Sequence, residues 1–512
     1  MQQSEYDVVI VGGAFAGASL GLLLKRRRPQ TRVLIVERVV KFDKKVGEST
    51  SEVSACFLTR ILRLTHHLER NHIAKQGLRL WFNDGVNTDP SRCSETGINY
   101  QTRLPTFQLD RSVLDEHLLE LAAQAGCDLM RPAKLVDWTP QPQSNLLRIS
   151  DDTGEKEIRA RWVVDASGKA SWISRKLGHW RRLESHPTNA IWSRFNNVAD
   201  IDGPEVAERY PAFANAVRCS RAAATNHLIG RGWWSWIIPL RCGEVSLGTT
   251  YDPRIFTLPK DGSIAERLLA NTVKHPIGKL LFEKATPVEG DQHAYGHLPY
   301  YSEKIASEAW CCVGDAAGFM DPLYSQGLDF VAYTVCATLP LICKALDGLD
   351  VGMQAEKLSA AYVQSCQRWQ ASLYHDKYQY LGDAELMNTS FLLDLSCYFI
   401  GPVRLVHDDL DKEFTIFPYS DAIGARVGKF MQFYNRRLAV LAQRRLASGC
   451  YGRRNVDWRF LVRGGFAPDT SVIKTLRTGL WHWLKAEAHG CKLPRVTKAE
   501  PMNAGAVTLQ ES

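Results

Sequence analysis

The chain has 512 residues, of which 45% are hydrophobic and 23% charged, a composition that is typical of globular domains and excludes a disordered, collagen-like or disulfide-stapled protein. The net charge of +8 comes from residues 401–512, where 18 Lys and Arg stand against 10 Asp and Glu. This excess indicates a solvated helical surface or a docking face for an acidic partner, and without a recognition motif it does not indicate nucleic acid. The 13 cysteines lack zinc-binding spacing, so we expect no metal site and reduced thiols. The first apolar run lacks signal-peptide features, so we expect a cytoplasmic protein. No apolar stretch of about 20 residues is evident, so we expect no membrane span.

The beginning of the chain predicts a βαβ unit. Residues 6–11 (YDVVIV) read as a buried strand, and a glycine turn leads into a helix over residues 14–28 that Pro29 stops. Residues 32–36 (RVLIV) read as the next strand. Two strands joined by one helix in about 30 residues are typical of a dinucleotide-binding fold.

The rest of the chain predicts a mixture of strands and helices, with no internal repeat. Helical spacing of apolar residues predicts helices over 51–64 and 112–125, and buried or alternating patterns predict strands over 77–82, 162–165 and 310–314. From about Tyr362 the pattern becomes mainly helical. We therefore expect an α/β protein with a helical C-terminal region.

The glycine turn is the first sign of a cofactor. Gly12, Gly13 and Ala14 open it and Gly17 closes it, so the chain has alanine at the third position of the usual GxGxxG pattern. Gly12 permits the tight turn, Gly17 permits close helix–strand packing, and the helix N-terminus faces a pyrophosphate. Glu37 ends the second strand, where its carboxylate can accept a hydrogen bond from a ribose hydroxyl. The alternative for Glu37 is a plain surface acid.

Two distant segments indicate that the dinucleotide is FAD. Residues 163–168 (VVDASG) and 312–318 (CVGDAAG) each run from a strand into a small-residue turn, and they resemble the second and third FAD fingerprints of the flavoprotein monooxygenase superfamily. The resemblance implies that Asp315 holds the ribityl chain and that Arg111 contacts the cofactor. NAD would explain the first signal alone. Two further cofactor contacts are expected: Arg38 and Ser49.

A tryptophan-rich strand carries the sharpest motif. Trp234-x-Trp236-x-Ile238-Pro239 matches the WxWxIP motif of flavin-dependent halogenases. The resemblance implies a wall of large rings between flavin and substrate, which keeps the substrate from being hydroxylated at the flavin. The alternative is a tryptophan-rich core strand, because aromatic stripes are usually packing.

Lys75 falls in a segment that resembles the one carrying the catalytic lysine of the halogenases. The resemblance implies that its amine hydrogen-bonds hypohalous acid, or traps it as a haloamine, with a pKa tuned by burial. A solvated surface lysine is the ordinary alternative. Arg79 is the rival cation, and its position within the strand makes it the weaker candidate.

Residues 319–327 (FMDPLYSQG) resemble the halogenase FxxPxxSxG segment. The resemblance implies that the amides of Gln326 and Gly327 bind halide and that Ser325 helps orient the lysine; a capped helix start without a ligand is the alternative. Tryptophan halogenases have a glutamate where this chain has Tyr324, which favours a phenol or pyrrole over tryptophan as substrate. No general base can be assigned from the sequence.

The resemblance, which covers roughly residues 5–340, implies a Rossmann-like FAD-binding domain, a mostly β substrate domain and a helical C-terminal region. It also implies that a flavin reductase supplies FADH2, that O2 and chloride or bromide are consumed, and that hypohalous acid passes Trp234 and Trp236 to reach Lys75. The aromatic substrate is free or attached to a carrier protein. An NAD(P)H-dependent FAD hydroxylase and a non-catalytic flavoprotein are the alternatives. The expected parts are 1–80, 105–175 and 295–370 for FAD, 81–104 and 176–294 for substrate, a helical domain over 371–498 and a loose tail over 499–512.

Overall fold

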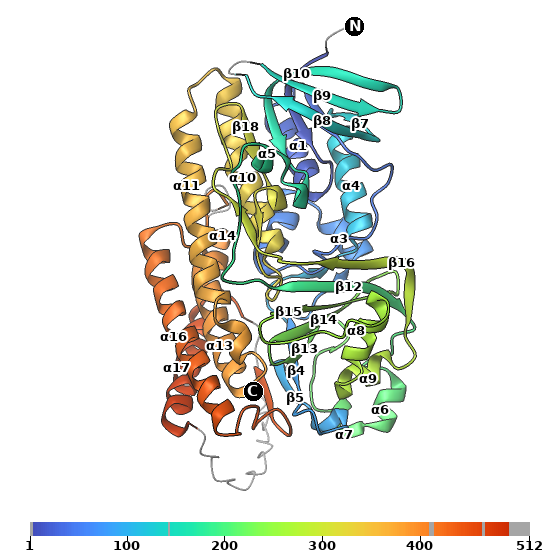
Figure 1. Ribbon diagram of the computed structural model, residues 1–512, viewed down its shortest axis with the longest axis vertical. Helices are drawn as coiled ribbons and strands as arrows, with labels where there is room; N and C mark the ends of the chain where they lie inside the picture. Colours follow the sequence, from blue (N-terminus) through green and yellow to red (C-terminus); the bar gives the residue numbers. More distant parts are fainter. Residues whose placement is uncertain (1–3, 142–143, 409–413, 463–465, 491–512) are drawn as a thin grey trace, which may run out of the picture.

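The computed structural model describes residues 4–141, 144–408, 414–462 and 466–490. A mainly parallel sheet with its helices forms one end of the molecule, a larger antiparallel sheet forms the other, and long helices run along the side of both (Figure 1). The mixed α/β class predicted from the sequence is confirmed. The tail expected at 499–512 lies outside the described residues.

The first sheet is built on short strands of almost entirely apolar residues. Strand β1 (Ser4–Val11) pairs in parallel with β2 (Val33–Val36) and β10 (Gly154–Asp165), and β10 pairs in parallel with β18 (Trp310–Cys312). Their central residues are buried, as expected for a parallel sheet covered on both faces. The sheet is completed by β7 (Asp128–Met130), β8 (Ala133–Thr139) and β9 (Asn145–Asp151).

Three helices pack around this sheet. Helix α1 (Phe15–Arg27) packs against α4 (Arg111–Gln124) and α10 (Gly327–Leu346). The helix predicted at 51–64 is shorter: α2 (Glu52–Cys56) continues as a π-helical turn, η1 (Phe57–Ile61). The short elements between them are α3 (Thr65–Asn71), η3 (Gly168–Ala170), α5 (Trp172–Lys176), η4 (Gly314–Ala316), and the strands β3 (Ile73–Ala74), β6 (Phe107–Gln108), β11 (Trp180–Arg182), β17 (Tyr300–Ser302) and β19 (Gly318–Phe319).

The second sheet has eight strands in the order β16-β12-β15-β14-β13-β4-β5-β20. Their bounds are β4 (Leu78–Phe82), β5 (Ser94–Ile98), β12 (Asn189–Asn196), β13 (Thr225–Gly230), β14 (Trp233–Pro239), β15 (Val245–Tyr251), β16 (Thr286–Tyr295) and β20 (Arg459–Val462). One face carries its own small core beneath α8 and α9, and the other joins the main core of the molecule. The accompanying short helices are η2 (Pro90–Arg92), α6 (Pro204–Arg209), α7 (Pro211–Ala214), α8 (Ile264–Thr272) and α9 (Pro276–Phe282).

The C-terminal region is mainly helical, as predicted, with one difference. Its elements are α11 (Gly352–Trp369), η5 (Gln370–Tyr374), α12 (Lys377–Tyr380), α13 (Ala384–Tyr398), η6 (Phe399–Val403), α14 (Arg404–Asp408), α16 (Ala422–Ala447) and α17 (Thr470–His489). Between the last two helices, β20 pairs in parallel with β5 and so adds a strand to the second sheet. Four residues are too few for a sequence pattern to separate a strand from a loop between helices.

The boundary expected between residues 80 and 81 falls inside strand β4.

The expectation that no apolar stretch is long enough to span a membrane needs correction. Two helical segments, Gly327–Leu346 and Ala384–His407, are long and apolar enough by length and composition, with mean hydropathies of 1.4 and 1.3. In each, 72% of the apolar window is buried inside the protein. Burial of this extent is what core helices show, so these segments are weak evidence for a membrane span.

Candidate active site

The turn between β1 and α1 has the shape that a bound dinucleotide requires. Gly12 has φ of 104°, and a Cβ there would lie 2.3 Å from the carbonyl oxygen of Ala166. A Cβ on Gly17 would lie 1.9 Å from the carbonyl oxygen of Gly12. Ala14, in contrast, has extended backbone angles as the N-cap of α1. Glycine is therefore required at positions 12 and 17, and alanine is tolerated at the position where the fingerprint departs from the usual pattern.

Glu37 and Arg38 lie at the end of β2. The buried carboxylate of Glu37 accepts hydrogen bonds from the backbone N–H of Gly13 (2.8 Å) and of Val39 (3.1 Å). These contacts fix both carboxylate oxygens beside the glycine turn, and each oxygen keeps a second lone pair for a ribose hydroxyl. The side chain of Arg38 is exposed.

Arg111 and Asp315 lie close enough for their charges to interact. The Arg111 guanidinium donates two hydrogen bonds of 3.0 Å to Asp115 and one of 3.1 Å to the carbonyl of Val46. The half-buried carboxyl of Asp315 has no side-chain partner among the described residues; burial raises its pKa to about 6, against the lowering effect of the Arg111 charge. A carboxyl without a side-chain partner can bind the hydroxyl group of a ligand, so the residues at this site fit FAD.

Lys75 is buried, with 4% of its surface exposed. Its ammonium donates hydrogen bonds of 2.8 Å to the hydroxyl of Ser49 and of 2.8 Å to the carbonyl of Thr50. Burial lowers the pKa of Lys75 to about 8, while the carboxylates of Glu52 and Asp329 act in the opposite direction. The sequence therefore led to a lysine with the burial and pKa that a reactive amine needs.

The hydroxyl that contacts Lys75 belongs to Ser49, which the sequence placed among the cofactor contacts. Ser325, expected to orient the lysine, forms no hydrogen bond with it among the described residues; it occupies the left-handed region with φ of 60° in the turn before α10. Arg79, the rival cation, is fully buried and forms an ion pair with Glu95 beneath the second sheet, which gives it a structural role.

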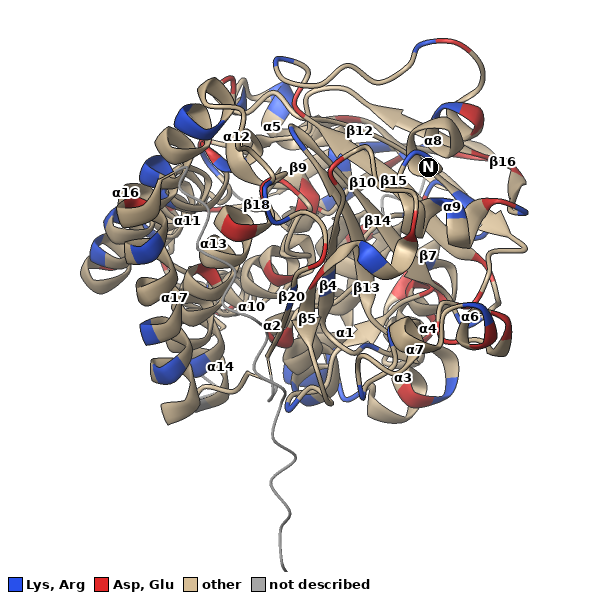
Figure 2. Ribbon diagram, turned by 90° about the horizontal axis from the view of Figure 1, so that it is seen from below, with Lys and Arg blue, Asp and Glu red and all other residues tan. Residues whose placement is uncertain are grey.

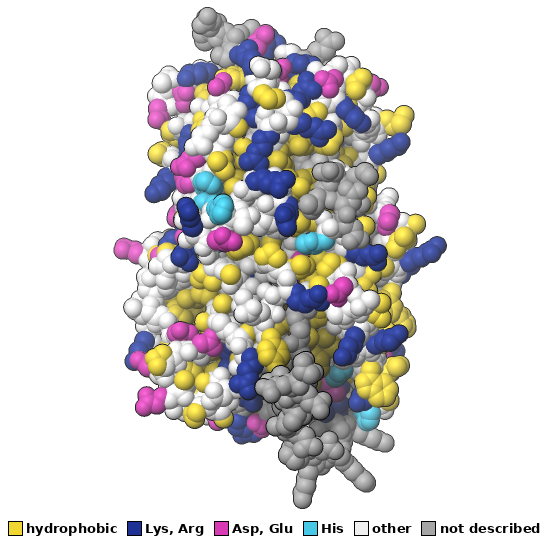
Figure 3. Space-filling model, turned by 180° about the vertical axis from the view of Figure 1, so that it is seen from behind, with side chains coloured by type: hydrophobic (Ala, Val, Ile, Leu, Met, Phe, Trp, Pro, Cys, Tyr) yellow, Lys and Arg dark blue, Asp and Glu magenta, His cyan; other side chains and the backbone are white. Residues whose placement is uncertain are grey.

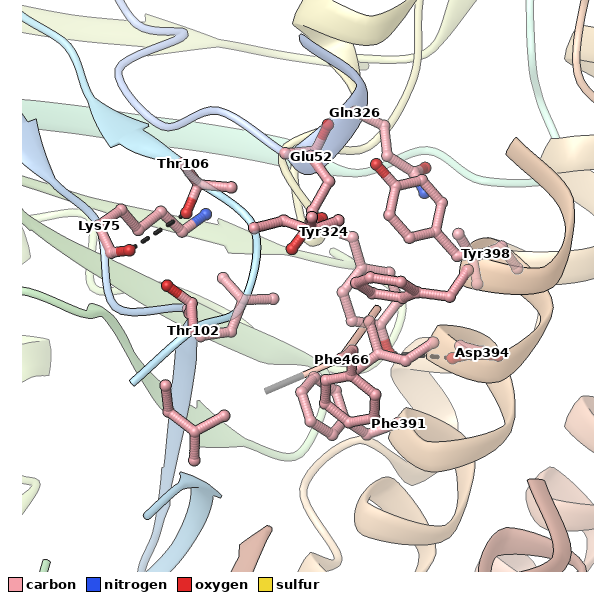
Figure 4. Close-up of a pocket in the computed structure, with 18 of the residues that line it drawn as sticks. Glu52, Lys75, Thr102, Thr106, Tyr324, Gln326, Phe391, Asp394, Tyr398 and Phe466 are labelled. Carbon is pink, nitrogen blue, oxygen red and sulfur yellow. Dashed lines mark hydrogen bonds between the residues drawn. The ribbon is translucent and has the colours of Figure 1, made fainter. Parts of the chain in front are cut away.

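A cavity opens in front of the lysine (Figure 4). Its polar lining includes Glu52, Lys75, Thr102, Thr106, Gln326 and Asp394, and its aromatic lining includes Tyr324, Phe391, Tyr398, Tyr419 and Phe466. The lysine side is formed by the chain between β3 and β4, and the aromatic side mainly by the C-terminal helices. A cavity with one cation and many ring faces suits a planar, electron-rich molecule.

Gln326 lines this cavity and also a second, smaller one. The smaller cavity is lined by Gly318, Phe319, Met320, Asp321, Gln326, Gly327, Phe330, Tyr362 and Cys366. Gln326 therefore lines both cavities, and its side-chain oxygen accepts a hydrogen bond of 2.7 Å from Tyr374. Gln326 and Gly327 begin α10, so their backbone N–H groups belong to the first turn, where helices leave donors free for an anion.

The tryptophans of the motif lie on the face of β14 that joins the main core. Trp234, Trp236 and Ile238 belong to that core with the residues around β1, whereas the intervening Ile237 belongs to the separate core beneath α8 and α9. The half-buried Pro239 ends the strand. The alternation fits a wall between the two sheets, although neither indole ring lines the lysine cavity.

Within this wall the ring of Trp234 is held at three points. Its indole N–H donates a hydrogen bond of 2.8 Å to Tyr378, and its ring centroid lies 5.8 Å from that of Trp236 and 4.8 Å from that of His227. Burial, together with the nearby Lys75 charge, lowers the pKa of His227 to about 3. His227, which the sequence did not reveal, thus lies beside the ring of Trp234 and within reach of the Lys75 charge.

Replacing Trp234 with phenylalanine is expected to lower the free energy of unfolding by about 2 kcal/mol, because the variant loses the indole N–H···Tyr378 bond and leaves space in the core. Chemical denaturation measures this change. Trp481→Phe is the matched control, since Trp481 is 57% exposed and should be close to neutral. Equal stability of both variants would contradict the tight packing of Trp234.

Comparison with known proteins agrees with this geometry. Residues 5–332 match the family described as FAD binding domain. A flavin-dependent halogenase from Dictyostelium discoideum is 25% identical over 77% of this chain and 70% of its own length. A brominase of pyrrole-2-carbonyl groups on a peptidyl carrier protein, from Pseudoalteromonas luteoviolacea, is 26% identical over 67% of this chain and 79% of its own. The crystal structure of the halogenase PltM in complex with phloroglucinol and FAD covers 88% of this chain and 97% of that one, with a TM-score of 0.69 and 17% identity.

The family match covers more than half of the chain, which therefore belongs to the FAD-binding family of flavoproteins. Several of its curated relatives are named halogenases, which are oxidoreductases, among them the flavin-dependent halogenase of Dictyostelium discoideum. FAD as the cofactor is thus confirmed, as is the α/β fold that the resemblance implied.

Proposed function

We propose that the protein halogenates an electron-rich aromatic ring, a phenol or pyrrole, by relaying hypohalous acid to Lys75. The observation that carries the proposal is the buried ammonium of Lys75 in a ring-lined cavity that shares Gln326 with a second cavity at the start of α10. A hydroxylase has no need of a buried amine at that place. A non-catalytic flavoprotein has no need of the cavity.

Each part of the site has a task in this reaction. Glu37, Arg111 and Asp315 would hold FAD, which, when reduced by a flavin reductase and exposed to O2, supplies the oxidising equivalent that converts halide to hypohalous acid. The first N–H groups of α10, at Gln326 and Gly327, would bind the halide. The Lys75 ammonium would hydrogen-bond the oxygen of hypohalous acid and make the halogen more electrophilic.

The wall around the site favours some substrates over others. Tyr324 lines the cavity where tryptophan halogenases have a glutamate, and its hydroxyl donates a hydrogen bond of 2.9 Å to Asp394. Phenols and pyrroles are more activated than the benzene ring of an indole, so they need less assistance from such an acid. Two of the similar proteins are associated with molecules of these kinds: the halogenase PltM was crystallised with the phenol phloroglucinol, and the brominase from Pseudoalteromonas luteoviolacea is named for a pyrrole.

The substrate arrives either free or on a carrier protein, and the basic C-terminal helices favour a carrier. Exposed Lys and Arg lie along α16 and α17 (Figure 2), and exposed hydrophobic side chains lie among them at that edge of the molecule (Figure 3). Carrier proteins are acidic, so such a surface steers their approach. Turnover of free acid as fast as carrier-loaded substrate would argue against this role. We also propose a cytoplasmic location, where reduced flavin and NADH are available.

Mass spectrometry of reaction products tests the proposed function. The purified protein is given FAD, a flavin reductase, NADH, O2, bromide or chloride, and phenol, phloroglucinol or pyrrole-2-carboxylate, the last both free and loaded on a carrier protein. Replacement of ring hydrogen by halogen is the expected result. Addition of one oxygen without a need for halide would instead identify a hydroxylase. The absence of any halide-dependent product would remove the proposal.

The pKa of Lys75 predicts an alkaline limit to the rate. Since the ammonium form is required and its pKa is about 8, the protonated fraction decreases as the pH rises through 8, and the rate should fall about tenfold per pH unit beyond it. Single-turnover halogenation with chemically reduced FAD measures this limb without the reductase. A rate that stays level up to the usual lysine pKa of 10.5 would show that the pKa of Lys75 is not lowered, and a rate that stays level beyond it would show that the amine does not act as an acid.

A further inference from the structure

One carboxylate in the cavity is not paired with a cation. Glu52, the first residue of α2, lines the cavity together with Lys75, and in Figure 4 its carboxyl group points into the space between Lys75 and the aromatic side chains. In the part of the chain that the structure describes, it forms no ion pair within 4.0 Å and no side-chain hydrogen bond with another residue. A half-buried carboxylate that faces a cavity without a fixed partner is free to accept a proton.

The other candidate bases at this site are already engaged. Asp394 also lines the cavity, but its oxygens accept hydrogen bonds from Tyr324, Ser390 and Tyr434, and its charge is paired with Lys377. Such a carboxylate has little capacity for a further proton. His227 lies outside the cavity lining, and burial lowers its pKa to about 3, which makes it a weak base.

The position of Glu52 is fixed from behind. Ser51 caps α2 and donates a hydrogen bond to Asp329 of α10, which also accepts one of 3.1 Å from the backbone N–H of Ser54. Tyr398 approaches the other oxygen of the same aspartate at 3.4 Å. The N-terminus of α2 is thereby tied to α10, and Glu52 is held opposite the lysine across the cavity.

We infer that Glu52 is the general base that removes the ring proton from the halogenated substrate. The inference rests on the proposed function. In the step, the ring carbon forms a bond to halogen as the halogen–oxygen bond of hypohalous acid breaks, and the leaving hydroxide takes a proton from the Lys75 ammonium to form water. The ring carbon then loses its proton to Glu52, and the C–H electron pair restores aromaticity. The products are halogenated ring and water.

The same arrangement restores the site after each reaction. Lys75 ends the step as a neutral amine and Glu52 as a neutral acid, so one proton passed from Glu52 to Lys75 returns both to their starting forms. Burial raises the pKa of Glu52, while the Lys75 charge and the glutamate's own backbone N–H lower it. A base with a raised pKa is the stronger acceptor once ionised, and the neighbouring ammonium favours the ionised form.

Glu52→Gln tests the inference, because glutamine has the same shape and accepts no proton. The full-length protein with FAD is assayed with bromide and either phenol or ring-deuterated phenol. We expect kcat to fall about a hundredfold and a primary deuterium isotope effect to appear that the wild type lacks, since proton loss becomes slow. Glu52→Asp, which keeps a carboxylate, should recover part of the rate. Glu69→Gln on α3 is the matched control, because Glu69 is exposed.

The outcomes separate this inference from the proposed function. If the wild type produces no halogenated phenol, phloroglucinol or pyrrole, the proposed function fails. If the wild type halogenates and Glu52→Gln is equally fast, the function stands and the inference is wrong. A slower Glu52→Gln variant without an isotope effect also overturns the inference, because Glu52 would then act only through the charge of Lys75. Flavin absorbance and circular dichroism verify that each variant is folded and loaded.

Discussion

Lys75→Met is expected to lower halogenation about a thousandfold while FAD stays bound. Methionine keeps an unbranched side chain of similar length but removes the donor that would polarise hypohalous acid. The neighbouring hydroxyl of Ser49 retains a partner in Thr225, 3.0 Å away, so the fold loses little besides the bond to Thr50. Product analysis by mass spectrometry, normalised to bound flavin, measures the effect.

The control for this variant is Lys134→Met, which removes an exposed lysine on β8 and should leave the rate unchanged. The Lys75 variant should still consume O2 with reduced FAD, because the cofactor residues are untouched. Hypohalous acid would then leave the protein unused, and a chemical trap in solution would collect more of it than with the wild type. Full halogenation by Lys75→Met would disprove the role of the amine.

Gly17→Ala is expected to release FAD, with affinity lowered at least tenfold, and to destabilise the fold by about 3 kcal/mol. The added Cβ would lie 1.9 Å from the carbonyl oxygen of Gly12, which is backbone and has no room to move because Gly12 is itself packed on Ala166. Helix α1 must therefore shift away from β1. Flavin fluorescence titration measures the affinity, and thermal unfolding measures the stability.

The matched control changes Ala14, the position where the chain departs from the usual GxGxxG pattern. Ala14→Gly creates the usual GxGxxG pattern, and glycine is acceptable at an N-cap, so this variant should bind FAD at least as well as the wild type. Retention of normal FAD affinity by Gly17→Ala would show that the turn is more plastic than its close contacts indicate.

The sequence predicted those parts of the site that depend on local chain geometry. The β1 turn with Gly12 and Gly17, the strand of Trp234, and the lysine before β4 each lie within a few residues of the pattern that reveals them. Their residue types are imposed by tight turns and by alternation along a strand, which can be recognised without knowing the rest of the fold.

The parts that the sequence missed depend on contacts between distant segments. Glu52 resembles an ordinary first-turn helix acid until α10 supplies Asp329 to hold its helix, nearly 280 residues later in the chain. The engaged state of Asp394 likewise depends on Lys377 and Tyr434 from two other helices. Ser49, expected at the cofactor, lies 26 residues before the lysine in sequence, and that separation gives no hint of their hydrogen bond.

The small strand β20 restricts how a molecule can reach Lys75. Strand β20 is hydrogen-bonded along β5, so the chain that follows α16 is attached to the second sheet. The helices that line the cavity therefore cannot move away as one rigid body without breaking the hydrogen bonds between β20 and β5. Rotation of individual side chains, or a brief local loosening of the backbone, would admit a molecule without breaking these hydrogen bonds. The width of the opening, more than any large hinge motion, would then set which rings are admitted.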